Sequence, residues 1–180
     1  MGKGAFAPSL ALVSYAASFA TGRDREKETA LLLLESAGYS AVTAYGGSFV
    51  LAAERPEQGD SIGFFDTDGR GVSLDAALAA SVIPPLRCQY LEISPGDGRA
   101  RRFWKRSLTA LLYTGAGLTA FQRMDDDKHW APDAFLGLAT GIGVGRALCD
   151  AHDESSPARA RLKLEPLAAG GAGVTFRWSL

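Results

Sequence analysis

The chain has 180 residues, which is long enough for a single domain with a sizeable hydrophobic core. Its formal net charge is −1, and its basic residues are dispersed apart from a cluster over residues 99–106, so the composition argues against a nucleic-acid partner. The two cysteines, Cys88 and Cys149, lack a metal-ligand spacing, and we predict that they are ordinary core residues or free thiols.

The first part of the chain predicts two helices. An apolar stretch over residues 8–21 forms the first, and a charged run over residues 23–28 opens the second. Apolar and small residues then recur at helical spacing, which predicts that their face of the second helix is buried. These residues are Leu31, Leu34, Gly38, Ala41, Val42 and Tyr45. Gly46-Gly47 is a candidate kink, and the apolar chain that follows is expected to stop before Pro56, because proline disfavours helix in the residue before it.

Residues 57–72 predict a polar loop, and further helices follow it. Ser73 is a suitable N-cap for a helix that runs to about Ile83 and is ended by Pro84-Pro85. Residues 101–121 predict a long helix with a basic first half and an apolar second half.

The last helix is expected to begin at Ala131 and Pro132, because proline is tolerated at the first helical position. Within it, Gly137, Gly141 and Gly145 fall four residues apart. One side of this helix is therefore bare backbone, which permits close packing against another helix.

Residues 161–165 and 174–178 alternate with period two around Gly170-Gly171, which predicts a β-hairpin. We therefore expect a mainly α protein, with a compact bundle of about five to six helices over residues 1–160. The short C-terminal β-hairpin over residues 161–180 is expected to pack on that bundle. No apolar run reaches about 18 residues without a charge or a helix breaker, so the sequence predicts no clear transmembrane helix. A membrane-surface or partly embedded protein remains an alternative.

The polar segment before the last helix holds the candidate site. His129 precedes a helix N-terminus, where backbone N–H groups and the helix dipole favour an anion. Asp133 is placed to accept a hydrogen bond from one ring nitrogen, and Arg123 to donate two parallel hydrogen bonds to phosphate oxygens. A nucleophilic imidazole, an orienting carboxylate and a guanidinium form a phosphoryl-transfer arrangement. The alternative is a charged surface turn that caps a helix.

Five residues separate Arg123 from His129, three separate His129 from Asp133, and a helix of small residues follows. This arrangement resembles the third signature of the type-2 phosphatidic acid phosphatase family. That family includes bacterial acid phosphatases and vanadium haloperoxidases. The resemblance implies that His129 is the phosphorylated nucleophile, that Asp133 orients it and that Arg123 binds phosphate.

The two earlier signatures of the family match only in part. The first signature is a lysine that is followed, after six residues, by Arg-Pro. Arg55-Pro56 fits this signature, but Ser48 stands at the lysine position. The second is Pro-Ser-Gly-His at the start of a helix. Here Ser73 is kept, but Val72 and Leu74 stand at the proline and glycine positions, and Asp75 replaces the histidine that protonates the leaving oxygen. The resemblance thus implies phosphate contacts from Arg55 and Ser73. It leaves Asp75 either as an improvised acid or as a first-turn carboxylate paired with the arginines.

Two functions follow as hypotheses. The first is a degenerate family member with weak or lost turnover, which serves as a binding or structural subunit of a larger assembly. Its expected mark is an exposed apolar helix face or a terminal strand, Val174–Trp178, that is left to pair with another chain. The second is an active phosphomonoesterase on lipid or small organic phosphates that works through a phosphohistidine, so the sequence leaves open whether the protein is an enzyme. Neither function implies a metal or another cofactor.

A third alternative is a membrane-surface protein that contacts anionic headgroups through residues 99–106. The family resemblance implies a periplasmic or membrane-associated location.

Overall fold

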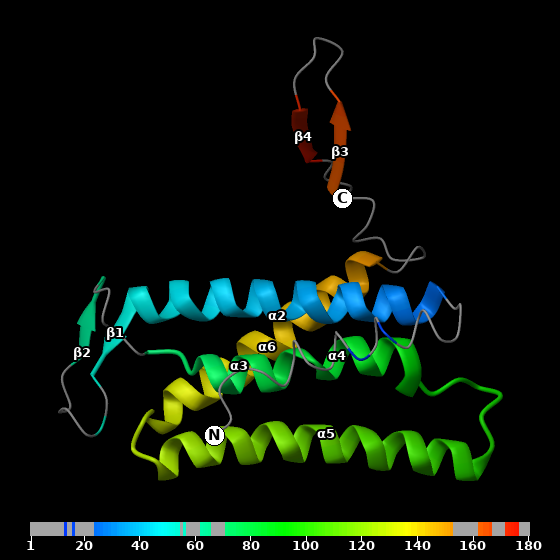
Figure 1. Cartoon of the computed structure of the whole chain (residues 1–180), viewed down its shortest axis with the longest axis horizontal. Helices are drawn as coiled ribbons and strands as arrows, with labels where there is room; N and C mark the ends of the chain where they lie inside the picture. Colours follow the sequence, from blue (N-terminus) through cyan, green and yellow to red (C-terminus); the bar gives the residue numbers. More distant parts are fainter. Residues whose placement is uncertain are drawn as a thin grey trace.

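The structure is a computed structural model that describes residues 13, 16, 24–54, 56, 62–65 and 71–152, together with the strands at 162–166 and 172–176. The predicted helix over residues 8–21 lies outside the described residues except at positions 13 and 16. The described chain is mainly helical, as predicted, and its long helices run side by side as a bundle (Figure 1). The helices are α2 (Asp24–Val50), α3 (Leu74–Ser81), α4 (Ile83–Leu86), a π-helical turn η1 (Arg87–Leu91), α5 (Arg99–Asp125) and α6 (Ala131–His152).

The centre of the bundle is the contact between α3 and α6, and both α2 and α5 pack against this pair (Figure 1). Three glycines of α6 face α3 and α4. A Cβ atom at Gly137 or Gly141 would overlap a backbone carbonyl of α3 or of the residue that caps it, and one at Gly145 would meet the Pro84 ring. The close packing predicted from the glycine spacing is therefore confirmed.

The predicted buried face of α2 is wrong. Leu31, Leu34, Val42 and Tyr45 are exposed, and the helix buries its opposite face, which is made of small and hydroxyl-bearing residues as well as two leucines. The buried residues are Thr29, Ala30, Leu32, Leu33, Ser36, Ala37, Ser40, Ala44 and Ser48. The reason is that α3 and α6 offer α2 a surface of small residues, which a serine and alanine face can approach more closely than a face of leucine and tyrosine.

Serine hydroxyls tie α2 to its neighbours. Ser36 Oγ donates to the Ser81 carbonyl over 2.7 Å. Ser48 Oγ donates to the Val72 carbonyl over 3.0 Å and accepts from the Val72 N–H over 3.1 Å. These bonds satisfy backbone groups that would otherwise be buried without a partner at the two ends of α3. The helix is continuous through Gly46-Gly47, so the candidate kink is not formed as a break in α2.

A short antiparallel strand pair follows α2 where we expected an apolar helical extension and a loop. β1 (Leu51–Ala53) pairs with β2 (Ile62–Phe64), and Leu51 lies opposite Phe64. The pairing gives partners to backbone groups that the helix no longer serves once it has ended. The prediction missed it because each strand is too short to show an alternating pattern.

The start of α3 is as predicted, because Ser73 is its N-cap and its side chain accepts from the Ala76 N–H. The predicted end is wrong. α3 stops at Ser81, and Pro84-Pro85 lie in the first turn of α4, where the missing proline N–H costs no hydrogen bond.

A disulfide joins Cys88 of η1 to Cys149 of α6, so the prediction of unpaired cysteines is wrong. The residues lie 61 positions apart, and the sequence does not reveal that η1 and the second half of α6 adjoin. The bond ties the π-helical turn to the helix at the centre of the bundle.

The C-terminal strands β3 (Leu162–Pro166) and β4 (Ala172–Phe176) pair antiparallel, with Leu162 opposite Phe176. Packing of this hairpin on the helices, and the division of the chain at residue 160, stay predictions.

Reduction of the disulfide tests the arrangement of η1 and α6. In the chain-entropy treatment, opening a 61-residue loop lowers the free energy of unfolding by about 4 kcal/mol. We expect Cys149→Ser to show this loss in chemical unfolding, and the native chain to have no reactive thiol until a reductant is added. Thiols that react fully without a reductant would contradict the pairing.

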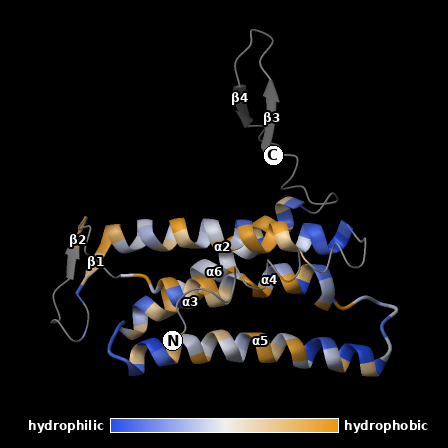
Figure 2. Cartoon of the chain, in the orientation of Figure 1, coloured by the Kyte–Doolittle hydropathy of each residue, from blue (hydrophilic) through white to orange (hydrophobic). Residues whose placement is uncertain are grey.

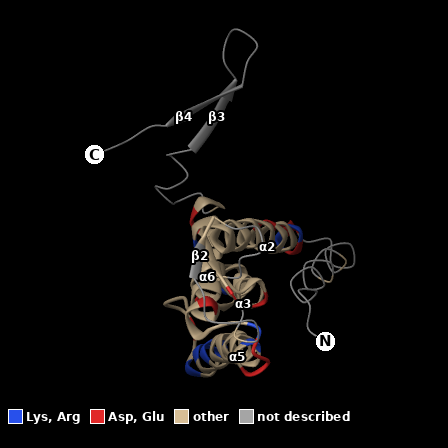
Figure 3. Cartoon of the chain, turned by 90° about the vertical axis from the view of Figure 1, so that its left-hand side faces the viewer, with Lys and Arg blue, Asp and Glu red and all other residues tan. Residues whose placement is uncertain are grey.

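A carboxylate fixes the loop that leads into α5. Asp97 accepts from Lys105 Nζ over 2.7 Å and from the Ser94 N–H over 3.0 Å, and its side chain is buried (Figure 3 colours the charged residues). The hydrogen bond from Lys105, followed by that from Ser94, lowers the pKa of Asp97 from its ordinary value of 3.8.

The unfolded chain therefore binds this proton at a higher pH than the folded chain does. The stabilisation is present above pH 3.8 and is lost as the pH falls toward the lower pKa of the folded state. We expect Asp97→Asn to lose this part of the pH dependence of unfolding. Asp24→Asn is the control, since Asp24 faces Lys27 at 3.5 Å with its side chain 94% exposed, and it should leave the dependence unchanged. Equal effects of the two substitutions would contradict the role of Asp97.

Candidate functional site

The predicted site lies where three helix ends meet: the start of α3, the end of α5 and the start of α6. A backbone hydrogen bond of 3.0 Å from the Ser73 N–H to the Asp133 carbonyl ties the starts of α3 and α6 together. The turn after α5 folds back on Arg123, whose carbonyl accepts from the Lys128 and His129 N–H groups at 3.1 and 3.2 Å. These bonds bring His129 beside the first turn of α6.

Asp127 allows this turn because it adopts a positive φ of 53°. Aspartate tolerates this left-handed conformation better than most residues that carry a Cβ atom. The acidic run before His129 thus has a conformational role that the sequence did not reveal.

The structure brings His129 and Asp133 together, and both are buried. His129 Nδ1 lies 3.9 Å from Asp133 Oδ2. The same carboxylate oxygen accepts from the Trp130 N–H over 3.0 Å, so Asp133 also caps the start of α6. The separation of 3.9 Å is longer than a hydrogen bond, although such contacts in ligand-free sites often shorten when a substrate binds.

Arg123 and Asp75 form an ion pair. Arg123 Nε lies 3.1 Å from Asp75 Oδ2, and the two side chains are 29% and 22% exposed. Asp75 stands in the first turn of α3, where a negative charge is favoured by the helix dipole. Pairing of Asp75 with an arginine is the outcome expected for a first-turn carboxylate, and it means that the guanidinium already faces an anion.

Ser73 is placed as a buried helix cap. Its hydroxyl accepts from the Ala76 N–H over 3.5 Å, its N–H donates to Asp133, and its carbonyl accepts from the Ala77 N–H over 3.0 Å. The polar groups of Ser73 thus serve the starts of α3 and α6, and the residue is fully buried, so it exposes no surface to a phosphate.

Arg55, the remaining predicted phosphate ligand, lies outside the described residues. Its neighbour Glu54 is held near the site, because Trp130 Nε1 donates to the Glu54 carbonyl over 3.0 Å. Ser48, at the lysine position of the first signature, is buried against Val72 and supplies no cation. Among the residues that the structure describes, no cluster of His, Cys, Asp or Glu suits a metal ion.

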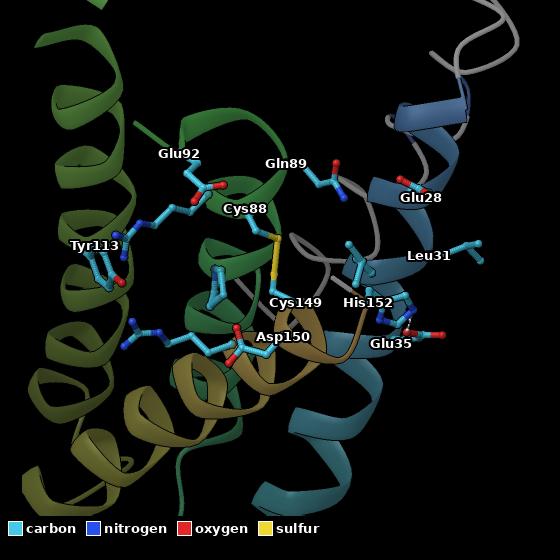
Figure 4. A pocket seen from close by; sticks show the side chains of 14 residues that line it. Glu28, Leu31, Glu35, Cys88, Gln89, Glu92, Tyr113, Cys149, Asp150 and His152 are labelled. Atoms are coloured by element: carbon cyan, nitrogen blue, oxygen red, sulfur yellow. Dashed lines mark ion pairs between the residues drawn. A yellow bond between two sulfur atoms is a disulfide. The ribbon is translucent and has the colours of Figure 1, made fainter. Parts of the chain in front are cut away.

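A second polar feature, which the sequence did not predict, lies at the opposite end of α6. It is an open groove of about 690 Å³ that is crossed by the disulfide (Figure 4). Its lining comes from α2, α4, η1, α5 and α6, and includes Arg87, Glu92, Tyr113, Arg146 and Asp150. No local pattern could reveal a groove assembled from five elements. Its basic and acidic groups are mixed, so its charge favours neither an anion nor a cation.

Comparison with known proteins identifies no relative: no family model matches the chain, and no curated protein or solved structure matches it. The family resemblance therefore rests on the signature residues alone.

Proposed function

We propose that the chain is a degenerate member of the type-2 phosphatidic acid phosphatase family, with weak or no turnover, which serves as a binding or structural subunit of a larger assembly. The observation that carries this proposal is the 3.1 Å ion pair between Arg123 and Asp75. In the family signature, the position of Asp75 belongs to the acid that protonates the leaving oxygen, and the arginine belongs to the phosphate.

The ion pair weakens both functions. The side chain of Asp75 faces the Arg123 guanidinium and is not held free for a leaving oxygen. It also places a carboxylate beside the arginine, where the phosphate would bind. Loss of a positioned general acid by itself typically costs roughly 10²- to 10⁴-fold in rate.

The surface of the bundle supports a role in an assembly. Large apolar side chains are exposed along α2 and α5, as a subunit that needs further cover would show. Membrane association belongs to the same proposal, since a bilayer is one form of such cover.

The second candidate is an active, metal-independent phosphomonoesterase on lipid or small organic phosphates. It is favoured by the buried pair of His129 and Asp133 at the start of α6. His129 would attack phosphorus, Arg123 and Arg55 would hold the phosphate, and Asp75 or water would protonate the leaving oxygen.

Substitution of Asp75 separates the two functions. We expect Asp75→Asn to bind vanadate or phosphate at least about tenfold more tightly than the native chain, because the carboxylate that faces Arg123 no longer opposes the anion. Calorimetric titration measures the affinity. The gain should vanish in Asp75→Asn/Arg123→Ala, and Asp150→Asn, which removes an acidic group at the other end of α6, should bind like the native chain.

The same position also tests turnover. Asp75→His restores a proton donor at the second signature and is expected to raise hydrolysis of a generic phosphomonoester by roughly 10²- to 10⁴-fold, in a manner that requires His129. Rapid hydrolysis by the native chain that is abolished in His129→Ala would contradict the degenerate function and establish the active phosphatase.

A further inference from the structure

The bundle carries two apolar stripes on its outer helices. The α2 stripe consists of Leu31, Leu34, Val42, Tyr45 and Phe49, with exposed fractions from 44% to 71%. The α5 stripe consists of Phe103, Trp104, Leu111, Leu118 and Phe121, with exposed fractions from 60% to 69%. At a rise of 1.5 Å per residue, each stripe is about 27 Å long.

The two stripes face away from each other. α2 and α5 both pack against α3 and α6, which lie between them (Figure 1). Each outer helix buries the face that meets this central pair, so its stripe points outward. A single partner docked on one side of the bundle would therefore cover one stripe and leave the other in water.

Charges are gathered at the ends of the helices. α5 has no charged residue from Ser107 to Gln122, and α6 has none from Ala134 to Gly145. On α2 the one charge between Thr29 and Val50 is Glu35, which faces His152 of α6 at 3.5 Å. In the hydropathy view the middle of the long helices is white or orange and the blue residues lie mainly toward their ends (Figure 2).

Small residues make up most of the interior, beside Leu32, Leu33, Val82 and Ile83, whereas many large apolar side chains of the outer helices are exposed. Buried Ser36, Ser40 and Ser48 line α2, and the alanines of α3 meet the glycines of α6. Proteins in water bury their large apolar side chains. Helices in a bilayer instead pack through small residues and interhelical hydroxyl bonds, because lipid is as apolar as leucine.

We infer that a lipid bilayer covers both stripes, with the helices of the bundle directed across it. The stripe length of about 27 Å approaches the hydrocarbon thickness of a bilayer, about 30 Å. Trp104 and Trp130, both exposed, lie near opposite ends of the bundle, where aromatic residues favour the interfaces. The basic residues over 99–106 then lie at one interface beside the lipid headgroups.

Helix composition agrees with this arrangement. In the described chain, α6 is long and apolar enough to cross a membrane. α2 and α5 are 27 residues long but have a lower average hydropathy, because charged residues gather toward their ends and because they also carry serine, threonine and glycine. Their outward stripes of large apolar side chains determine how each helix meets the bilayer.

A second copy of the chain is a poorer cover. A twofold dimer uses the same patch on both protomers, so it would hide one stripe and leave the other exposed. The bilayer surrounds the bundle and covers both. This inference specifies how the membrane association named in the proposed function would occur. It does not depend on the phosphate site, so membrane embedding and phosphate binding can each fail without the other.

Flotation of the full chain with vesicles tests the inference. We expect the chain to float with neutral phosphatidylcholine vesicles and to resist release by high salt and by alkaline carbonate. With Trp130 and Trp178 replaced by Phe, the fluorescence of Trp104 should be quenched by brominated phosphatidylcholine. Release by salt together with a need for anionic lipid would overturn embedding in favour of surface attachment.

Two lysine substitutions locate the lipid-facing surface. Val42→Lys and Leu111→Lys place a charge in the middle of the α2 and α5 stripes, and each is expected to lower partition into vesicles by roughly 100-fold. Ala100→Lys adds the same charge at an exposed position near the start of α5 and is the matched control, which should partition like the native chain. Equal partition of all three variants would overturn the assignment of the stripes.

Vesicle binding and oligomeric state of the native chain test the inference even where a variant fails to fold. A soluble monomer that does not bind vesicles would overturn the inference and would mean that another part of the chain covers the stripes. A soluble oligomer with protected stripes would overturn it in favour of a second copy.

Discussion

The contact between α3 and α6 is the constraint on which the rest of the structure depends. The two helices meet with almost no side chain between them, because Gly137 and Gly141 lie directly against the backbone around the first two turns of α3. This approach sets the starts of both helices side by side and makes possible the hydrogen bond from Ser73 to Asp133. The position of every candidate site residue on α3 and α6 follows from it.

The same constraint explains the distribution of polar and apolar side chains. A central pair of helices lined by glycine and alanine offers neighbours a surface that serine and alanine can approach closely. α2 therefore turns its serines inward and its large apolar residues outward. The inward serines of α2 and its exposed apolar residues are two consequences of this packing.

Local signals predicted what depends on local structure. The cap at Ser73, the start of α6 at Ala131, the long helix α5 and the close packing of the α6 glycines are confirmed. The spacing of Arg123, His129 and Asp133 predicted residues that the structure brings near one another, although their chemistry stays a proposal.

Features that depend on tertiary neighbours were missed. Helical spacing cannot tell whether an apolar face packs against protein or stays exposed, so the buried face of α2 was assigned to the wrong side. The disulfide and the groove beside it join elements that are distant in sequence. The ion pair of Asp75 and Arg123 was anticipated only as one of two roles for Asp75, since both depend on which group lies within reach.

The most direct test compares two glycines of α6 that differ only in what they face. A Cβ atom at Gly141 would overlap the backbone of α3, whereas one at Gly143 meets nothing within 4 Å. We expect Gly141→Ala to lower the free energy of unfolding by about 1–3 kcal/mol through overpacking. Gly143→Ala should leave it unchanged or raise it by up to about 1 kcal/mol, because alanine favours helix. Unfolding of both variants in the same lipid or detergent decides the matter, and equal stability of the two would contradict a structure built on the contact between α3 and α6.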